Sequence, residues 1–210
     1  MVKPSGQIET DARTRILDAA DAVFVRHGID GARMQEIANQ AGVNKALLHY
    51  YFRSKADLAR AVWLRIASSF APGVLQLLAS ELALDDKIDR LVEAYYDTLT
   101  KHPYLLVYVV SEAARHPQLV DEIYTPERKL AARGMIATLR RQLEEKARAE
   151  NTVPLSAEQF LVTLLGSCLF PFVARPMLTT VLGLSPDEFS SFIEKRRRDL
   201  PLFLKRALQQ

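Results

Sequence analysis

Apolar residues recur along this chain at intervals of three and four, the spacing that places side chains on one face of an α-helix. In the first such segment the predicted inward-facing stripe comprises Ile16, Ala20, Val23, Phe24 and His27. The later periodic segments also have helical spacing, and none shows the strict alternation that is typical of strands. The pattern therefore predicts an all-α protein.

Interruptions of this pattern divide the chain into four regions. Residues 1–9 are polar and predict a disordered arm, and residues 10–54 predict a small domain of three short helices. Residues 55–72 predict a connecting helix that ends near Pro72 and Gly73, because proline disrupts a helix interior. Residues 73–210 predict a larger helical bundle.

The small domain contains the signals of two short helices joined by a tight turn. Ile37, Ala38 and Ala41 form one apolar stripe, and Gly42 follows where a helix ends in the left-handed conformation. Asn44 is a good N-cap for a second helix that starts at the next residue. Two helices joined in this way are typical of a helix-turn-helix, whose second helix can enter a DNA major groove.

Residues on the outer side of the second helix favour a nucleic-acid partner. Lys45 stands at a helix N-terminus, where phosphate is attracted, and Lys55 opens the next helix, which is capped by Ser54. His49 and Tyr50 offer polar tips suited to phosphates and base edges. The alternative is an ordinary helical hairpin with aromatic core residues and solvated lysines.

The run AGVNKALLHYYFRSKADL resembles the DNA-binding signature of the TetR family of bacterial transcription regulators. The positions that match the signature are Ala41, Gly42, Val43, Leu48, Tyr51, Phe52, Ser54, Lys55 and Leu58. The sequence departs from the family pattern at Met34, Ala46, Leu47 and His49. These departures affect which operator sequence we expect the protein to bind, and they leave the expected DNA-binding role unchanged.

Carried onto this chain, the resemblance implies a sequence-specific DNA reader. The predicted DNA-binding residues are Arg33, Asn44, Lys45, Ala46, Leu47, His49, Tyr50, Tyr51 and Lys55. Phosphate contacts are expected from the two lysines, Arg33 and Tyr51. Base contacts are expected from Leu47, His49 and Tyr50.

Composition agrees with a soluble regulator. The net charge of the chain is +3, and residues 26–60 alone carry an excess of that size, which permits a small phosphate footprint. The single cysteine, Cys168, and the absence of a secretory pattern at the N-terminus indicate a reducing cytoplasm. Residues 160–184 are apolar and long enough to span a bilayer, but Pro171, Arg175 and Pro176 disfavour a membrane helix.

The last two predicted helices, 156–174 and 186–208, carry more apolar surface than one monomer easily hides. Each begins with a capping box, Ser156 with Gln159 and Ser185 with Glu188. We therefore expect a homodimer packed on these two helices. The family resemblance independently implies the same arrangement, in which each subunit reads one half of an inverted repeat.

The resemblance also implies an apolar pocket for a small apolar or amphipathic inducer in the larger domain. The candidate ligand-binding residues are Trp63, Phe70, Tyr95, Tyr104, Tyr108, Glu112 and Phe172. The alternative is that these aromatic residues are plain core.

Other chemistry receives little support. Glu112 and His116 lie four residues apart but lack a third ligand with metal-site spacing, so we predict no metal and no cofactor. The sequence has no Gly-rich phosphate loop, no GxSxG or HExxH motif and no paired-carboxylate signature. The sequence predicts a repressor released from its operator by a ligand. The remaining alternatives are a helical enzyme and a dimeric interaction protein in which the helix-turn-helix is only a scaffold.

Overall fold

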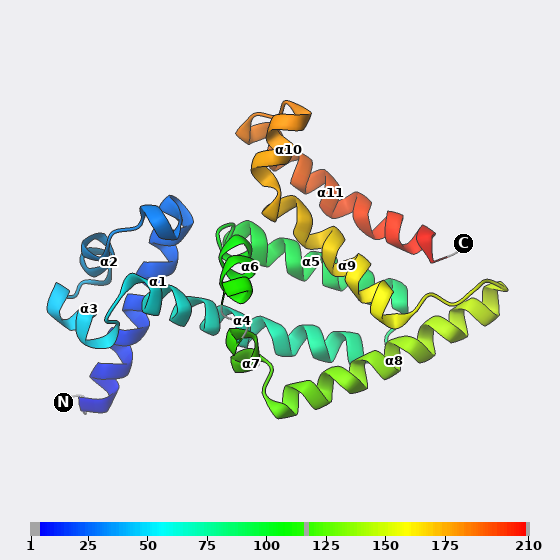
Figure 1. Cartoon of the computed structure of the whole chain (residues 1–210), viewed down its shortest axis with the longest axis horizontal. Coiled ribbons are helices and arrows are strands. Elements are labelled where there is room, and N and C mark those ends of the chain that lie inside the picture. Colours follow the sequence, from blue (N-terminus) through cyan, green and yellow to red (C-terminus); the bar gives the residue numbers. More distant parts are fainter. Residues whose placement is uncertain (1–4, 116–117, 209–210) are drawn as a thin grey trace.

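The computed structural model describes residues 5–115 and 118–208, and these form eleven helices with no strand (Figure 1). Helices α1 to α3 form a small head, and α5 to α11 form a larger body. Helix α4 joins the two. The helices are α1 (Ser5–Gly31), α2 (Met34–Ala41), α3 (Lys45–Tyr51), α4 (Lys55–Ala79), α5 (Leu84–Lys101), α6 (Leu105–Arg115), α7 (Gln118–Ile123), α8 (Pro126–Glu150), α9 (Ala157–Val173), α10 (Arg175–Leu182) and α11 (Pro186–Ala207).

The first helix begins earlier than the sequence pattern predicts. Helix α1 starts at Ser5, so residues 5–9 of the predicted arm are helical, whereas residues 1–4 lie outside the described part. Neither glycine nor proline interrupts residues 7–27, and the backbone continues through Thr10 and Asp11 instead of being capped there. Near its end the helix breaks at Gly28, whose φ of 67° and ψ of 172° are not helical.

Helix α4 is longer than predicted and belongs to both parts of the molecule. It passes through Pro72 and ends at Ala79. Proline removes only one hydrogen bond of the helical ladder, and beyond it Leu75 and Leu78 are buried in the core of the body. At its other end Leu58 is buried in the core of the head. One helix is therefore rooted in two separate cores.

Two short helices, α7 and α10, have no counterpart in the sequence prediction. Helix α10 follows α9 after a single residue, and the two axes differ by 74°. Pro176 lies in the first turn of α10, and Gly183, with a φ of 64°, ends it. Because of the bend, residues 160–184 do not form one straight helix. Among the described helices, α4 has the length and hydropathy of a membrane-crossing helix. Helices α9 and α10 meet the same test only if the bent pair is taken as one span. One or two such helices are weak evidence for a membrane protein.

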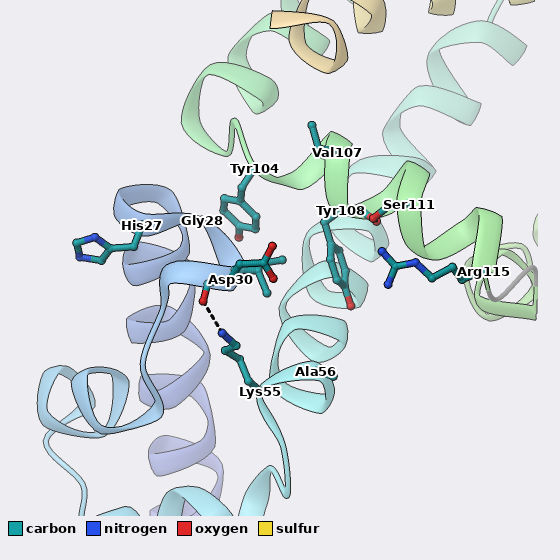
Figure 2. Close-up of a pocket in the computed structure, with 11 residues that line it drawn as sticks. His27, Gly28, Asp30, Lys55, Ala56, Tyr104, Val107, Tyr108, Ser111 and Arg115 are labelled. Atoms are coloured by element: carbon teal, nitrogen blue, oxygen red, sulfur yellow. Dashed lines mark hydrogen bonds between the residues drawn. The ribbon is translucent and has the colours of Figure 1, made fainter. Parts of the chain in front are cut away.

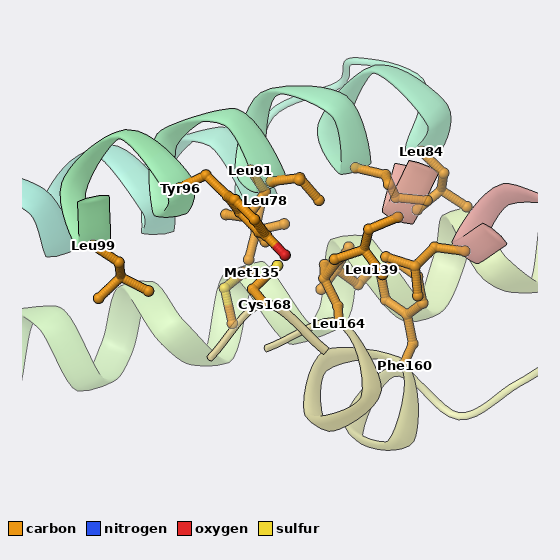
Figure 3. Close-up of a cluster of buried hydrophobic side chains, with 14 of the residues drawn as sticks. Leu78, Leu84, Leu91, Tyr96, Leu99, Met135, Leu139, Phe160, Leu164 and Cys168 are labelled. Carbon is orange, nitrogen blue, oxygen red and sulfur yellow. The ribbon is translucent and has the colours of Figure 1, made fainter. Parts of the chain in front are cut away.

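The body is organised around a core shared by α5, α8 and α9 (Figure 3). Leu91, Leu139 and Leu164 are completely buried in it. Lys87 is buried beside this core, and its ammonium donates to the carbonyl of Leu78 and to Gln142 Oε1, both at 2.7 Å. Burial lowers the pKa of this lysine.

Of the two predicted capping boxes, the one at Ser185 is confirmed, whereas at Ser156 the described bonds include only the one from the Gln159 N–H. The Thr125 hydroxyl accepts from the backbone N–H of Arg128, and Ser156 does the same for Gln159. Ser185 and Glu188 form the complete capping box predicted for α11. Helix α11 also packs along α5, where Arg197 pairs with Glu93 and Asp97.

Candidate nucleic-acid interface

The head is a small domain with its own apolar core. Its members come from α1, α2, α3 and the first turns of α4. The buried residues are Ile16, Leu17, Ala19, Ala20, Val23, Phe24, Ala32, Ile37, Ala38, Ala41, Leu48, Phe52, Leu58, Ala59 and Val62. This core fixes α2 and α3 against α1, so the outer side of α3 is presented by a rigid scaffold.

The turn between α2 and α3 has the geometry of a helix-turn-helix. Gly42 adopts the left-handed conformation (φ 65°, ψ 37°), and its backbone N–H bonds to the carbonyl of Asn39. The N–H of Val43 bonds to the carbonyl of Ala38 at 3.0 Å. Asn44 then caps α3, its side-chain oxygen accepting from the N–H of Leu47 at 2.7 Å. The predicted glycine turn and N-cap are confirmed.

Most of the predicted DNA-binding side chains lie together on the outer surface of α3 and at its start. Lys45, Ala46, His49 and Tyr50 are exposed, and Tyr50 is 72% exposed. Tyr50 is held edge-on against half-buried Tyr51, with 5.3 Å between ring centroids. Asn44 and Arg33 are also exposed, whereas Leu47 is half-buried.

Two of the positively charged side chains in residues 26–60, Lys55 and Arg26, form hydrogen bonds within the head. The Lys55 ammonium donates to the carbonyl oxygens of Asp30 at 2.7 Å and Ala32 at 3.2 Å, which ties the α1–α2 loop to the start of α4. Arg26 binds Glu36 and Gln40 on α2. Lys45 has no partner among the described hydrogen bonds and ion pairs, so it is the lysine best placed to meet a phosphate.

The head meets the body at the corner between α5 and α6. There Asp21 of α1 accepts from His102 Nδ1 at 2.9 Å and from the Tyr104 hydroxyl at 2.6 Å. A second link joins Arg65 of α4 to Asp18 of α1 at 2.7 Å. Sequence reasoning missed both links, because their partners are separated by 47 to 83 residues.

Electrostatics at this corner favour an ionised carboxylate. Burial raises the pKa of Asp21, but hydrogen bonds from His102 and Tyr104, together with the charges of His102 and Arg65, outweigh that effect and leave the pKa below its ordinary value. Burial and the bond to Asp21 raise the pKa of Tyr104, so its hydroxyl remains a donor. An ionised carboxylate only accepts hydrogen bonds, so His102 carries a hydrogen on Nδ1.

A cleft of about 550 Å³ opens beside this corner (Figure 2). Tyr104 and Tyr108 reach into it from the body, facing Asp30 and Lys55 of the head region. Trp63 of α4 is buried beneath the same part of α6, where it packs with Leu105, Tyr104 and Tyr108.

The predicted ligand-binding residues do not line one cavity. Tyr104 and Tyr108 border the cleft at the junction, and Trp63 is packed nearby. Phe70 stacks edge-on against Tyr95 inside the body, with ring centroids 4.9 Å apart.

The other ligand candidates lie elsewhere. Phe172 packs on Tyr96 and borders a separate cavity of about 200 Å³ between α5, α9 and α11. The side chains of Glu112 and His116 lie outside the described residues. Cys168 is fully buried and burial raises its pKa to about 12, which makes it an inert thiol.

Comparison with known proteins agrees with this geometry. Residues 16–62 match the family model described as "Bacterial regulatory proteins, tetR family". The chain is 30% identical over 128 residues to the transcriptional activator FasR of Mycolicibacterium smegmatis, a match that spans 61% of this chain and 54% of that protein. It is 26% identical over 187 residues to the probable regulator YttP of Bacillus subtilis, spanning 86% of each. It is 36% identical over 94 residues to the repressor SCO4008 of Streptomyces coelicolor, spanning 45% of each.

Solved structures show the same fold. A TetR/AcrR-family regulator from Thermobifida fusca superposes with a TM-score of 0.58 at 18% identity, covering 91% of this chain and 97% of that one. FadR from Bacillus subtilis, in complex with stearoyl-CoA, superposes with a TM-score of 0.53 at 16% identity, covering 88% and 95%.

A capped helix-turn-helix carried on an all-α body defines a DNA-binding transcription regulator. Residues 16–62 of this chain form the DNA-binding domain of the TetR family of bacterial regulatory proteins. Proteins of this family are regulators that bind DNA operators and ligands and act as dimers.

Proposed function

We propose that this protein is a cytoplasmic, homodimeric repressor that binds an inverted-repeat operator and is released from it by a small apolar or amphipathic ligand, with no enzymatic activity of its own. The observation that carries the proposal is the exposed face of α3, held in position by the Gly42 turn and the Asn44 cap. Lys45 stands in the first turn of α3, where the helix dipole and its own charge both attract phosphate. His49 and Tyr50 project from the same helix toward solvent and are our candidates for base contacts.

Dimerisation through α9 and α11 is supported by their outer faces. On α9, Val162, Leu165, Leu169 and Val173 share one side at helical spacing and are exposed or half-buried, opposite the buried side. A Cβ added to Gly166 on that side would meet nothing within 4 Å. A second copy packed there would cover this apolar surface and leave two heads to read two half-sites.

The outer face of α11 combines aromatic and charged residues. Phe192, Arg196, Asp199 and Phe203 lie three to four residues apart and border a groove of about 480 Å³. Phe203 is 67% exposed. Aromatic residues are enriched at protein interfaces, so an exposed phenylalanine beside this groove supports an interface there.

Control by a ligand is supported by the fold. The structural relative FadR was solved with stearoyl-CoA. In this chain a ligand in the body could act through α4, which is buried in both cores. Release requires only that ligand and DNA favour different conformations, with a coupling typically of about 1–3 kcal/mol.

The direction of regulation is the part of the proposal for which the relatives differ. FasR is named an activator and SCO4008 a repressor. We favour repression, in which the DNA-bound protein blocks transcription and ligand frees the operator. A reporter gene under the recovered operator tests this, because deleting the regulator should raise expression. A fall in expression would identify an activator.

The first experiment is a selection of bound sequences from random duplex DNA with the wild-type protein, Lys45→Ala and Lys129→Ala. The wild type should recover one inverted repeat. Lys129→Ala should recover the same repeat, because Lys129 lies on α8, away from the head, and pairs with Asp121. Lys45→Ala should bind all sequences more weakly, and its affinity should depend less on salt by about one charge per subunit. No enrichment by folded wild-type protein would favour the scaffold interpretation.

A further inference from the structure

The contact between head and body at the α5–α6 corner combines a polar cluster with the packing of Tyr104 and Tyr108 against the head core. Asp21 receives both of its side-chain hydrogen bonds on one oxygen, from His102 and Tyr104. The carboxylate and the imidazole are 20% and 21% exposed, so water screens this contact only in part. The 550 Å³ cleft lies beside it, so the two parts are not joined there by continuous packing.

Each side of the contact is rooted in its own apolar core. On the head side Phe24, one helical turn after Asp21, is fully buried and meets the ring of Tyr104 edge-on, with 5.7 Å between centroids. On the body side Leu99 and Leu106 flank His102 and Tyr104 and belong to the main core. A displacement of either core therefore reaches the Asp21 carboxylate directly.

The corner itself is held in a defined shape. The N–H of His102 bonds to the carbonyl of Thr98, and the N–H of Leu105 bonds to the carbonyl of His102, both at 3.0 Å. Pro103 stands between His102 and Tyr104 and fixes one backbone angle. The two donors therefore move as one unit with the end of α5 and the start of α6.

The geometry points to Asp21, His102 and Tyr104 as positioning residues that couple the body to the DNA-binding head. We name these three residues the corner latch. They form a second route beside α4, whose Trp63 packs against Tyr104. When α5 and α6 shift, the latch carries α1 with them or breaks. This inference rests on the proposed function, since the coupled event at the head is DNA binding.

Reciprocity allows the latch to be tested without knowing the ligand. If the body influences the head, DNA bound to the head must change the body by the same coupling free energy. The probe is the operator duplex recovered by selection, and the readout is amide hydrogen exchange of the full-length protein with and without that duplex.

In the wild type, the operator should change exchange over residues 95–108 by about fivefold or more, the lower end of typical coupling between linked sites. The double variant His102→Asn with Tyr104→Phe should still bind the duplex. In this variant the duplex should change the exchange rates of residues 95–108 by less than about twofold. The change in exchange of α8, which packs against α4, should persist. Thr180→Val, which removes an exposed hydroxyl on α10, is the control and should behave as wild type.

A double variant that transmits the full change would overturn the latch, and so would a wild type that binds the operator with no change at the corner. Tyr104→Phe alone, which keeps the ring against Phe24, serves if circular dichroism shows that the double variant does not fold. Failure of the wild type to bind any duplex would instead remove the proposed function. The latch would then be judged from the free proteins, because breaking it should speed exchange over residues 16–24, and unchanged exchange there would overturn it.

Discussion

The ammonium of Lys55 joins the start of α4 to the segment between α1 and α2. It bridges the carbonyl of Asp30, at the end of α1, and the carbonyl of Ala32, in the loop before α2. This lysine therefore contributes to the shape of the domain, and any phosphate must share an ammonium that already serves two acceptors. Lys45, in contrast, is exposed and has no partner among the described hydrogen bonds and ion pairs.

Lys55→Met should destabilise the head by about 1–2 kcal/mol, because two carbonyls lose a charged donor. The effect should be local, with faster hydrogen exchange in residues 28–41 and little change in α8. Lys45→Met should leave that exchange unchanged while weakening DNA binding. Equal exchange in both variants would show that the two hydrogen bonds do not hold the loop.

Asp21 should make the stability of the protein depend on acid. Its pKa is lowered on folding, so the ionised carboxylate stabilises the native state above the ordinary pKa of 3.8, and this contribution is lost as pH falls through the lower native value. Asp21→Asn should therefore be less stable than wild type at pH 7, and the difference should shrink below pH of about 4. Urea unfolding from pH 7 to pH 3 measures this, with the exposed Asp86→Asn as control. A difference that stays constant with pH would contradict the assigned ionised state.

At the scale of single elements, the turn between α2 and α3 depends on one glycine. Gly42 has a φ of 65°, which costs an L-residue about 1 kcal/mol or more. An added Cβ would meet nothing closer than the Arg15 guanidinium, at 3.5 Å. The need for glycine at this position is therefore conformational and not a matter of space.

Gly42→Ala should lower the free energy of unfolding by about 1 kcal/mol and weaken DNA binding through a displaced α3. Gly134→Ala is the matched control, since Gly134 lies inside α8 and an added Cβ would meet nothing within 4 Å. That change should raise the free energy of unfolding by about 0.5–1 kcal/mol. Thermal unfolding of both variants measures these effects, and two shifts of the same sign would exclude the strain at Gly42.

Local signals account for what the sequence could predict. The turn at Gly42, the Asn44 cap and the start of α11 at Ser185 depend on residues a few positions apart, and their chemistry can be read directly. Helix α4 passes Pro72 because Leu75 and Leu78 find a core supplied by distant segments. Such tertiary stabilisation overrides a local breaker and is not visible in a short window.

Parts of the candidate site could not be predicted for the same reason. The exposed face of α3 follows from helical periodicity, whereas the partners of Arg26 and Lys55 within the head are set by packing. Asp21 carries no local signal at all, because its partners lie more than 80 residues away. The scattering of the predicted ligand-binding aromatics likewise reflects helix packing.

At the scale of the whole molecule, the proposed dimer places two heads on one DNA duplex. Helices α9 and α11 lie side by side at one edge of the body (Figure 1). Their outer faces carry the apolar residues that a second copy would cover. Affinity for an inverted repeat then depends on both subunits.

Phe203→Glu should convert the dimer to monomer, because a charge would be buried against the partner's apolar face. Affinity for the inverted repeat should fall by about a hundredfold or more as the second head is lost. Leu130→Glu is the control, since Leu130 is equally exposed, at 69%, but lies on α8. Sedimentation velocity and operator binding measure both effects, and a dimeric Phe203→Glu protein would place the interface elsewhere.

The chain has one tryptophan, and Trp63 is buried at 4% exposure where α4 passes beneath α6. Indole emission depends on the polarity and the aromatic neighbours of the ring. The intact, unlabelled protein therefore carries an optical reporter at the junction through which head and body communicate. Compound libraries can be screened by fluorescence before any operator is known, and the rate of the conformational change can be followed in the same signal.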